Sequence, residues 1–273
     1  MSERGAPVFL EYLRPDKEMP TVWCEGCGIG IVLGAIVRAV VGLGLEPSEV
    51  AMVSGIGCTG RMGTYVDFPA MHVTHGRALA FATGLKLVRP QLKVMAVMGD
   101  GDALAIGGNH FIHAARRNLE VCAVVVNNRT YGMTGGQSSP MTPLGDPTST
   151  APAGHLEPAF DLAALAEAAG ASFVARSTVY HVLELQKLLA RALAKKGFSV
   201  VEVLAHCHTY HGRMTGTPQA AEMLGLLREI TAPVTLDPAR REGKIPRGVL
   251  VDRSRPEFGE EYRRMQGEPQ RGH

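Results

Sequence analysis

The chain has 273 residues, of which 45% are hydrophobic and 20% charged, and its formal net charge at pH 7 is +2. This length allows one large domain or two small ones with a sizeable core. The small net charge gives no reason to expect a nucleic acid or an anionic membrane as a partner. No run of about 18 uncharged apolar residues predicts a membrane span. The N-terminal residues do not resemble a secretory signal, so we expect a cytoplasmic protein. Its five cysteines, an odd number, argue against a disulfide framework.

Apolar runs with strand-like and helix-like lengths alternate along the chain. In chain order, we expect a helix over 28–41, a strand over 50–54, a helix over 76–88, a strand over 93–98, a helix over 103–117, a strand over 120–126, a helix over 161–169, a strand over 171–175, a helix over 179–196 and a strand over 199–204. Residues 1–23 are expected to form an irregular arm. A Gly-, Ser-, Thr- and Pro-rich loop spans 130–158, and loops of this length are usually functional or disordered.

This alternation predicts an α/β fold with a mostly parallel sheet and helices on both faces, because the strands are continuously apolar. Ligands of such sheets bind at the carboxyl ends of the strands. Loops that carry Cys58, Asp100, Asn128 and Cys207 all follow predicted strands. From about residue 236 the composition becomes charged and Pro-rich. We therefore expect one ligand-binding domain over 1–235 and a tail over 236–273 that packs on the domain or on a partner.

Two oxygen donors follow neighbouring predicted strands. Asp100 lies in the turn Gly99-Asp100-Gly101, and Asn127-Asn128 ends the next strand. Carboxylate and carboxamide oxygens suit a hard divalent cation such as Mg²⁺, which in turn suits a diphosphate. A helix N-terminus after Asp100 would add N–H groups for phosphate oxygens. The alternative is that Asp100 only caps that helix.

Four of the five cysteines form a candidate metal set. Cys24 and Cys27 form a C-x-x-C motif, Cys58 lies in a glycine-rich loop, and Cys207 follows a strand. Four thiolates can bind zinc or an iron–sulfur cluster. Two alternatives stay open. One is a C-x-x-C with a redox role or no role, together with two buried thiols. The other is a zinc site that combines two cysteines with two of the neighbouring histidines. Those histidines are His206, His208 and His211. The fifth cysteine, Cys122, lies within an apolar run and is expected in the core.

The sequence Gly-Asp-Gly followed about two dozen residues later by Asn-Asn resembles the signature of thiamine diphosphate enzymes. This resemblance implies that Asp100, Asn128 and the backbone carbonyl of Thr130 hold Mg²⁺, with Asn127 in a supporting role.

Together with the cysteines, the chain resembles the beta subunit of 2-oxoacid:ferredoxin oxidoreductases over nearly its whole length. The matching segments are residues 23–28, 55–58, 75–77, 99–102, 127–128, 131–137 and Cys207. The resemblance implies that Cys24, Cys27, Cys58 and Cys207 bind one [4Fe–4S] cluster close to thiamine diphosphate. Glu25 is a departure, because the family commonly has Pro within this C-x-x-C. An acidic residue near the cluster would favour a lower reduction potential.

The resemblance also gives a set of cofactor-binding residues around the diphosphate. These are Gly57, Cys58, His75, Gly99, Asp100, Gly101, Asp102, Asn128, Thr130, Gly132, Met133 and Thr134. Arg61 is the candidate catalytic residue, since it could hold a substrate carboxylate or a phosphate of coenzyme A. A surface ion pair explains Arg61 equally well.

The implied reaction is the oxidative decarboxylation of a 2-oxoacid with coenzyme A to acyl-CoA and CO₂, with electrons passing through the cluster to ferredoxin. The reverse reaction would carboxylate an acyl-CoA. The loop at 131–137 looks most like members that act on 2-oxoglutarate, and pyruvate and branched-chain 2-oxoacids remain open.

We expect a larger alpha subunit as partner, because the pyrimidine-binding domain and its activating Glu have no counterpart in one sheet domain. The unit would be a heterodimer, and this chain would be inactive alone. Two other classes stay open: a subunit of a non-oxidative thiamine diphosphate enzyme and a non-catalytic, zinc-stabilised binding subunit.

Overall fold

The computed structural model describes residues 8–17 and 20–267. Its centre is a sheet with the strand order β2-β1-β3-β4-β6-β5-β8-β7. All neighbouring strands are parallel except β5 and β8, which are antiparallel. The strands are β1 (Val50–Ser54), β2 (Ala70–His72), β3 (Lys93–Gly99), β4 (Cys122–Asn127), β5 (Phe173–Thr178), β6 (Ser199–Leu204), β7 (Thr231–Pro233) and β8 (Ile245–Asp252).

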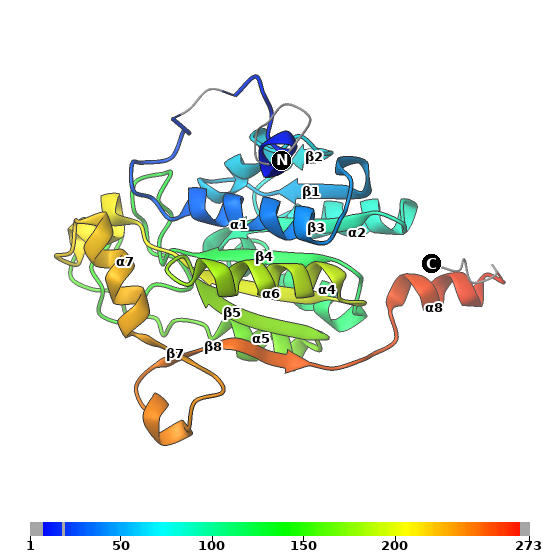
Figure 1. Ribbon diagram of the computed structural model, residues 1–273. Helices are drawn as coiled ribbons and strands as arrows, with labels where there is room; N and C mark the ends of the chain where they lie inside the picture. The colour runs from blue at the N-terminus through cyan, green and yellow to red at the C-terminus, as the bar shows by residue number, and fades with distance from the viewer. Residues whose placement is uncertain (1–7, 18–19, 268–273) are drawn as a thin grey trace.

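Helices cover both faces of this sheet (Figure 1). On one face α1 (Ile29–Gly42) and α6 (Val182–Ala194) pack together, and on the other lie α2 (Ala78–Val88), α4 (Gly108–Arg117) and α5 (Leu162–Ala169). Each face has its own hydrophobic core: the first lies under α1 and α6, the second under α2, α4 and α5. Successive strand residues point to opposite faces, so Val97 joins the first core whereas Ala96 and Met98 join the second. The predicted α/β fold with a mostly parallel, doubly covered sheet is confirmed.

Shorter helical segments complete the chain. They are the α-helices α3 (Asp100–Leu104), α7 (Ala220–Glu229) and α8 (Phe258–Met265), the 3₁₀ segments Val8–Tyr12, Pro47–Glu49, Thr59–Thr64 and Pro238–Arg241, and a π-helical turn at His208–Gly212. None of the described helices combines the length and hydrophobicity needed to cross a membrane.

The prediction of one helix over 103–117 is wrong. Helix α3 already begins at Asp100 and ends at Leu104, and α4 begins at Gly108. At the break there is no room for a side chain on Gly107, because a Cβ atom there would lie 2.3 Å from the carbonyl oxygen of Asp102. The chain folds tightly at this point, so the helix before the break presents Asp100 and Asp102 at the end of β3.

Part of the segment after residue 236 belongs to the sheet. Strand β8 pairs with β5, and its Val251 is buried in the second core. Beyond β8, the Glu257 carboxylate accepts a hydrogen bond from the backbone N–H of Glu120 (3.1 Å), and Lys196 Nζ lies 2.6 Å from a carboxylate oxygen of Glu260 on α8. The described part of this segment therefore packs on the domain.

Four adjacent strands bring the candidate residues to one edge. Strands β1, β3, β4 and β6 are neighbours, and their carboxyl ends are nearly level in the pairing register. The loops that follow them carry Cys58, Asp100, Asn128 and Cys207, respectively. The topology therefore gathers residues that are up to 149 positions apart (207 − 58) in the sequence.

Candidate active site

A pocket of about 270 Å³ opens at this edge of the sheet. Every residue that the sequence suggested for cofactor binding lines it. They are Gly57, Cys58, His75, Gly99, Asp100, Gly101, Asp102, Asn128, Thr130, Gly132, Met133 and Thr134. The pocket also includes Ile56, Thr59 and Tyr131, which are not in the cofactor-binding set that the sequence suggested.

Asp100 is the buried acidic group of this pocket. Its side chain is 2% exposed, and one carboxylate oxygen accepts a hydrogen bond from Ser139 Oγ at 2.6 Å. Burial raises the pKa of Asp100 to about 7, although hydrogen bonds from Ser139 and from backbone N–H groups oppose the shift. The N-cap of α3 is Gly99, so Asp100 does not act as the helix cap that the alternative reading assumed. A divalent cation at this carboxylate would offset the free energy cost of its burial.

Asn128 and Thr130 approach the pocket from the turn that follows β4. Between them Arg129 adopts a left-handed φ of 64°, so the chain reverses sharply and both neighbours line the pocket. Both side chains are buried, and the backbone N–H of Thr130 donates to Asn128 Oδ1 at 3.4 Å. The three predicted Mg²⁺ ligands thus share one pocket, and their oxygen donors fit that ion chemically.

A second acidic group pairs with a histidine. Asp102 Oδ1 lies 2.7 Å from His75 Nδ1 and accepts a hydrogen bond from the backbone N–H of Gly76 at 2.6 Å. Burial raises the pKa of Asp102, and the neighbouring His75 opposes this shift. Both side chains line the pocket.

Tyr131 belongs to the matching segment 131–137, but the sequence did not assign it to the cofactor-binding set. Its ring covers Gly101, where a Cβ atom would lie 2.2 Å from the ring, and its hydroxyl donates to the Gly101 carbonyl at 3.3 Å. The sequence carries one indirect signal for this contact, because the second glycine of Gly-Asp-Gly leaves room for a side chain to approach closely.

The four candidate cysteines come together beside the pocket. Burial, together with the nearby Cys207, Cys58 and Cys24, raises the pKa of Cys27 to about 11. Backbone N–H groups of residues 209–211 hydrogen-bond to the Cys207 sulfur. The pocket and the thiols meet at Gly132, where a Cβ atom would lie 3.4 Å from Cys207 Sγ and 3.9 Å from Cys58 Sγ.

The histidines needed for a mixed zinc site have other partners. His206 Nε2 donates to the carbonyl of Gly26 at 2.8 Å, and His211 Nε2 lies 2.8 Å from Asp146 Oδ2. Over residues 8–17 and 20–267, no three Cys, His, Asp or Glu side chains converge closely enough to hold a single metal ion. The geometry therefore does not favour the combination of two cysteines with two of these histidines.

Arg61 lies outside the pocket. It is exposed on the 3₁₀ segment Thr59–Thr64, and its positive charge lowers the pKa of Cys58, which burial raises overall. Among the described residues, no acidic side chain forms an ion pair with Arg61. The exposed Arg61 therefore lies close enough to Cys58 for its charge to act on that thiol.

Comparison with known proteins identifies the family. Residues 55–203 match the family described as "Thiamine pyrophosphate enzyme, C-terminal TPP binding domain", in which thiamine pyrophosphate is another name for thiamine diphosphate. The chain is 53% identical over 221 residues to 2-oxoglutarate synthase subunit KorB of Archaeoglobus fulgidus, covering 81% of this chain and 80% of that one. It is 43% identical to 2-oxoacid:ferredoxin oxidoreductase subunit beta of Saccharolobus solfataricus, covering 84% and 76%. The chain belongs to the 2-oxoacid:ferredoxin oxidoreductase beta subunits.

A solved structure supports the same assignment. The beta subunit superposes with a TM-score of 0.83 and 32% identity on a chain of 2-oxoglutarate:ferredoxin oxidoreductase from Magnetococcus marinus, covering 95% of this chain and 90% of that one. That structure was solved with 2-oxoglutarate, coenzyme A and succinyl-CoA bound. The protein is therefore a subunit of an oxidoreductase of this class, as predicted.

The thiamine diphosphate match covers only part of the site. Its range contains every residue of the pocket, including Cys58, but begins after Cys24 and Cys27 and ends before Cys207. Most of the thiol set thus lies outside the part that the beta subunit shares with thiamine diphosphate enzymes in general.

Proposed function

We propose that this beta subunit carries out, with a partner, the oxidative decarboxylation of 2-oxoglutarate with coenzyme A to succinyl-CoA and CO₂. Electrons would leave through a [4Fe–4S] cluster to ferredoxin, and the same site would work in the reverse direction. One observation carries the proposal: Gly132 lines the pocket and also lies against Cys207 and Cys58. A diphosphate cofactor in the pocket and a cluster on the thiols would therefore be neighbours.

The pocket has the donor set that a magnesium diphosphate needs. Asp100, Asn128 and the carbonyl of Thr130 would hold Mg²⁺, and the buried carboxyl of Asp100 makes no ion pair of its own among the described residues. When bound, thiamine diphosphate supplies a stabilised carbanion for decarboxylation. The residues of this chain bind and orient it, and the Tyr131 ring covers Gly101 at the wall of the pocket.

The thiols have the environment that an iron–sulfur cluster needs. In a [4Fe–4S] cluster each thiolate binds a different iron, so Cys24, Cys27, Cys58 and Cys207 need not converge on one point. Hydrogen bonds from backbone N–H groups to Cys207 would stabilise the charge on the sulfur. Trp23 adds a contact, because its indole N–H donates to the carbonyl of Cys58 at 2.7 Å.

The choice of substrate rests on the relatives. Four beta-subunit relatives, at 42% to 53% identity, carry the name 2-oxoglutarate synthase, and the superposed structure holds 2-oxoglutarate and coenzyme A. Arg61 would bind the substrate carboxylate or a coenzyme A phosphate, because its guanidinium is exposed beside the cysteines.

A second subunit completes this site in the proposal. The relatives are named as subunits, and we propose that a larger alpha subunit supplies the pyrimidine-binding domain and the activating Glu. Alone, the beta subunit would bind neither substrate nor cofactor productively.

The test is anaerobic co-purification with the neighbouring subunit. We expect iron, acid-labile sulfide and a brown absorbance in the wild type, and viologen reduction with 2-oxoglutarate and coenzyme A. Cys58→Ser should lose the cluster and viologen reduction. Cys122→Ala is the matched control, since Cys122 is buried in the core among apolar residues, and it should keep both.

Each contrary result points to a different function. Zinc without iron would favour a zinc-stabilised subunit, and full activity in Cys58→Ser would favour a non-oxidative thiamine diphosphate enzyme. Viologen reduction with pyruvate or a branched-chain 2-oxoacid, but not with 2-oxoglutarate, would retain the reaction and change the substrate.

A further inference from the structure

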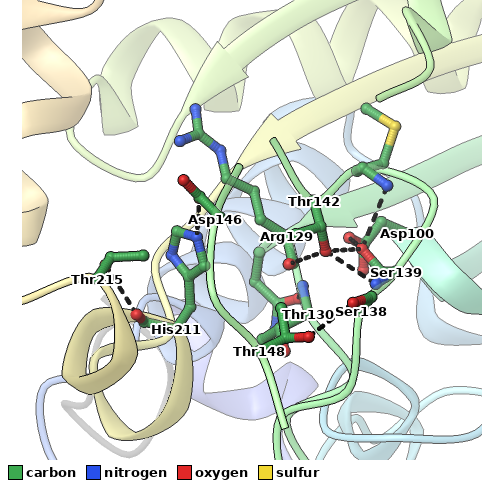
Figure 2. A network of polar contacts seen from close by, with 12 residues as sticks. Asp100, Arg129, Thr130, Ser138, Ser139, Thr142, Asp146, Thr148, His211 and Thr215 are labelled. Atoms are coloured by element: carbon green, nitrogen blue, oxygen red, sulfur yellow. Dashed lines mark hydrogen bonds and ion pairs between the residues drawn. The ribbon is translucent and has the colours of Figure 1, made fainter. Parts of the chain in front are cut away.

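Two buried hydroxyl groups from the long loop after β4 reach the predicted cation site. Ser139 is 3% exposed and Thr142 is 0% exposed. Ser139 Oγ donates to Asp100 Oδ2 at 2.6 Å, and Thr142 Oγ1 donates to the carbonyl oxygen of Arg129 at 2.7 Å. Both contacts can be followed in Figure 2.

The protons of both hydroxyls have a fixed direction. Ser139 Oγ accepts the backbone N–H of Met141 at 3.2 Å, so its own proton is left for the carboxylate of Asp100. Thr142 Oγ1 accepts the backbone N–H of Ser139 at 2.9 Å, so its proton is left for the Arg129 carbonyl. The two hydroxyl oxygens lie 3.5 Å apart, so the shorter contacts to Asp100 and Arg129 are the better acceptors and orient both hydroxyls as donors toward the site.

These two hydrogen bonds end on opposite halves of the cation site. Asp100 follows β3, whereas Arg129 lies between Asn128 and Thr130 after β4. Arg129 has a left-handed φ of 64°, which is a strained conformation for a residue with a side chain, so the turn needs support from outside. The Ser139–Thr142 pair connects the two halves within one buried set of hydrogen bonds.

We propose that Ser139 and Thr142 are positioning residues for the divalent cation: they orient the Asp100 carboxylate and hold the Asn128–Thr130 turn against it. The inference rests on the proposed function, because it assumes that Asp100, Asn128 and Thr130 bind Mg²⁺. Groups that hydrogen-bond to metal ligands typically change metal affinity by about 10- to 100-fold when they are removed. A buried carboxylate depends strongly on such donors because water does not reach it.

The experiment titrates Mg²⁺ into the co-purified, cation-free complex of both subunits at a fixed thiamine diphosphate concentration, followed by calorimetry. Thr142→Val keeps the shape of the side chain but removes the hydroxyl, whereas Thr142→Ser keeps the hydroxyl. Ser139→Ala removes the other donor. We expect Thr142→Val and Ser139→Ala to weaken Mg²⁺ binding by about 10- to 100-fold and Thr142→Ser to bind nearly as the wild type.

Ser138→Ala is the matched control in the same loop. Ser138 Oγ lies 2.6 Å from Thr148 Oγ1 and makes no hydrogen bond to Asp100 or Arg129. Its loss should leave Mg²⁺ affinity unchanged. A second readout separates positioning from folding: with saturating Mg²⁺, Ser139→Ala should recover the wild-type kcat, and its iron content should equal that of the wild type.

The outcomes separate this inference from the proposed function. If the wild-type complex binds no Mg²⁺ with thiamine diphosphate, the proposed function is wrong. If the wild type binds and Ser139→Ala binds equally well, or Ser138→Ala loses as much affinity as Ser139→Ala, the positioning role alone is wrong. If Thr142→Val does not assemble, the comparison of Ser139→Ala with Ser138→Ala still decides.

Discussion

Asp100 is an acidic residue in surroundings that disfavour its charged form. The carboxyl group is buried, and burial raises its pKa to about 7, whereas an aspartate in water has a pKa of 3.8. Near neutral pH it is therefore divided between the neutral acid and the carboxylate. Acidic groups with a strongly shifted pKa are typical of functional sites, and a cation bound at Asp100 would favour its charged form.

The raised pKa of Asp100 predicts a pH dependence of stability in the cation-free protein. Between pH about 4 and about 7 the native state binds a proton at Asp100 that the unfolded state has released. As the pH rises through this window, the free energy of unfolding should therefore fall by about 1.4 kcal/mol for each pH unit. Asp100→Asn removes the linkage, so the wild-type minus variant difference, measured by urea denaturation at several pH values, should carry that slope. A difference that does not change with pH would contradict the burial argument.

Gly101 predicts a steric coupling with Tyr131. A Cβ atom at Gly101 would lie 2.2 Å from the Tyr131 ring, so Gly101→Ala should displace the ring and destabilise the protein by about 1–3 kcal/mol. In a chain that already carries Tyr131→Ala, the same substitution should be nearly neutral. A double-mutant cycle of unfolding free energies measures the coupling. Additive effects would show that the two residues do not compete for this space.

At the scale of elements, Asn118 joins four segments. It ends α4 with a left-handed φ of 55°. Its Nδ2 donates to the carbonyls of Arg255 and Pro256, and its Oδ1 accepts from Ser172 Oγ at 2.8 Å and from the backbone N–H of Phe198 at 2.9 Å. One side chain thus connects the end of α4 with the starts of β5 and β6 and with the segment after β8.

Substitutions at Asn118 separate backbone strain from hydrogen bonding. Asn118→Gly accepts the left-handed conformation but loses the side-chain hydrogen bonds, and it should cost about 2–4 kcal/mol. Asn118→Ala should cost about 1 kcal/mol more, because alanine is strained in this conformation. Thermal and urea unfolding of both variants give the two values. Equal stability of Asn118→Gly and the wild type would mean that these hydrogen bonds contribute nothing.

The sequence predicted the central elements well because their pattern is local. The bounds of β1 and β6 agree with the predicted strands at 50–54 and 199–204, since both are short, mostly apolar runs of strand-like length. The break between α3 and α4 could not be predicted, because it depends on the approach of Gly107 to the Asp102 carbonyl. Helix α7 and strands β2, β7 and β8 were not found; β2 and β7 have three residues each, and β8 depends on pairing with β5.

The pocket also combines features that local sequence patterns predict with contacts that form only in the folded chain. Its lining could be predicted because the residues belong to short motifs that each follow a strand. The contacts of Ser139, Thr142 and Tyr131 with Asp100, Arg129 and Gly101 could not be predicted, because they depend on the path of a long loop that no local pattern fixes. The role of Arg61 and the ligands of the cluster stay predictions.

At the scale of the whole molecule, strand β8 protects the edge of β5. Without β8, the backbone groups of β5 would form an unpaired edge, and such edges favour aggregation. A chain truncated after Leu236 should therefore be aggregated or unfolded in sedimentation and circular dichroism measurements. A chain truncated after Gly267 is the control and should remain folded. A stable, monodisperse chain ending at residue 236 would instead support the predicted domain over 1–235.

The hydrogen bond from Trp23 to the Cys58 carbonyl has an optical consequence. The sequence contains one tryptophan, and its indole N–H lies 2.7 Å from the backbone of a predicted cluster ligand. Fluorescence from this chain excited at tryptophan wavelengths therefore originates beside the thiols and nowhere else. A coloured iron–sulfur centre there would quench that emission by energy transfer, and its loss on exposure to air would restore the signal. Trp23 would thus report on cluster assembly without a label.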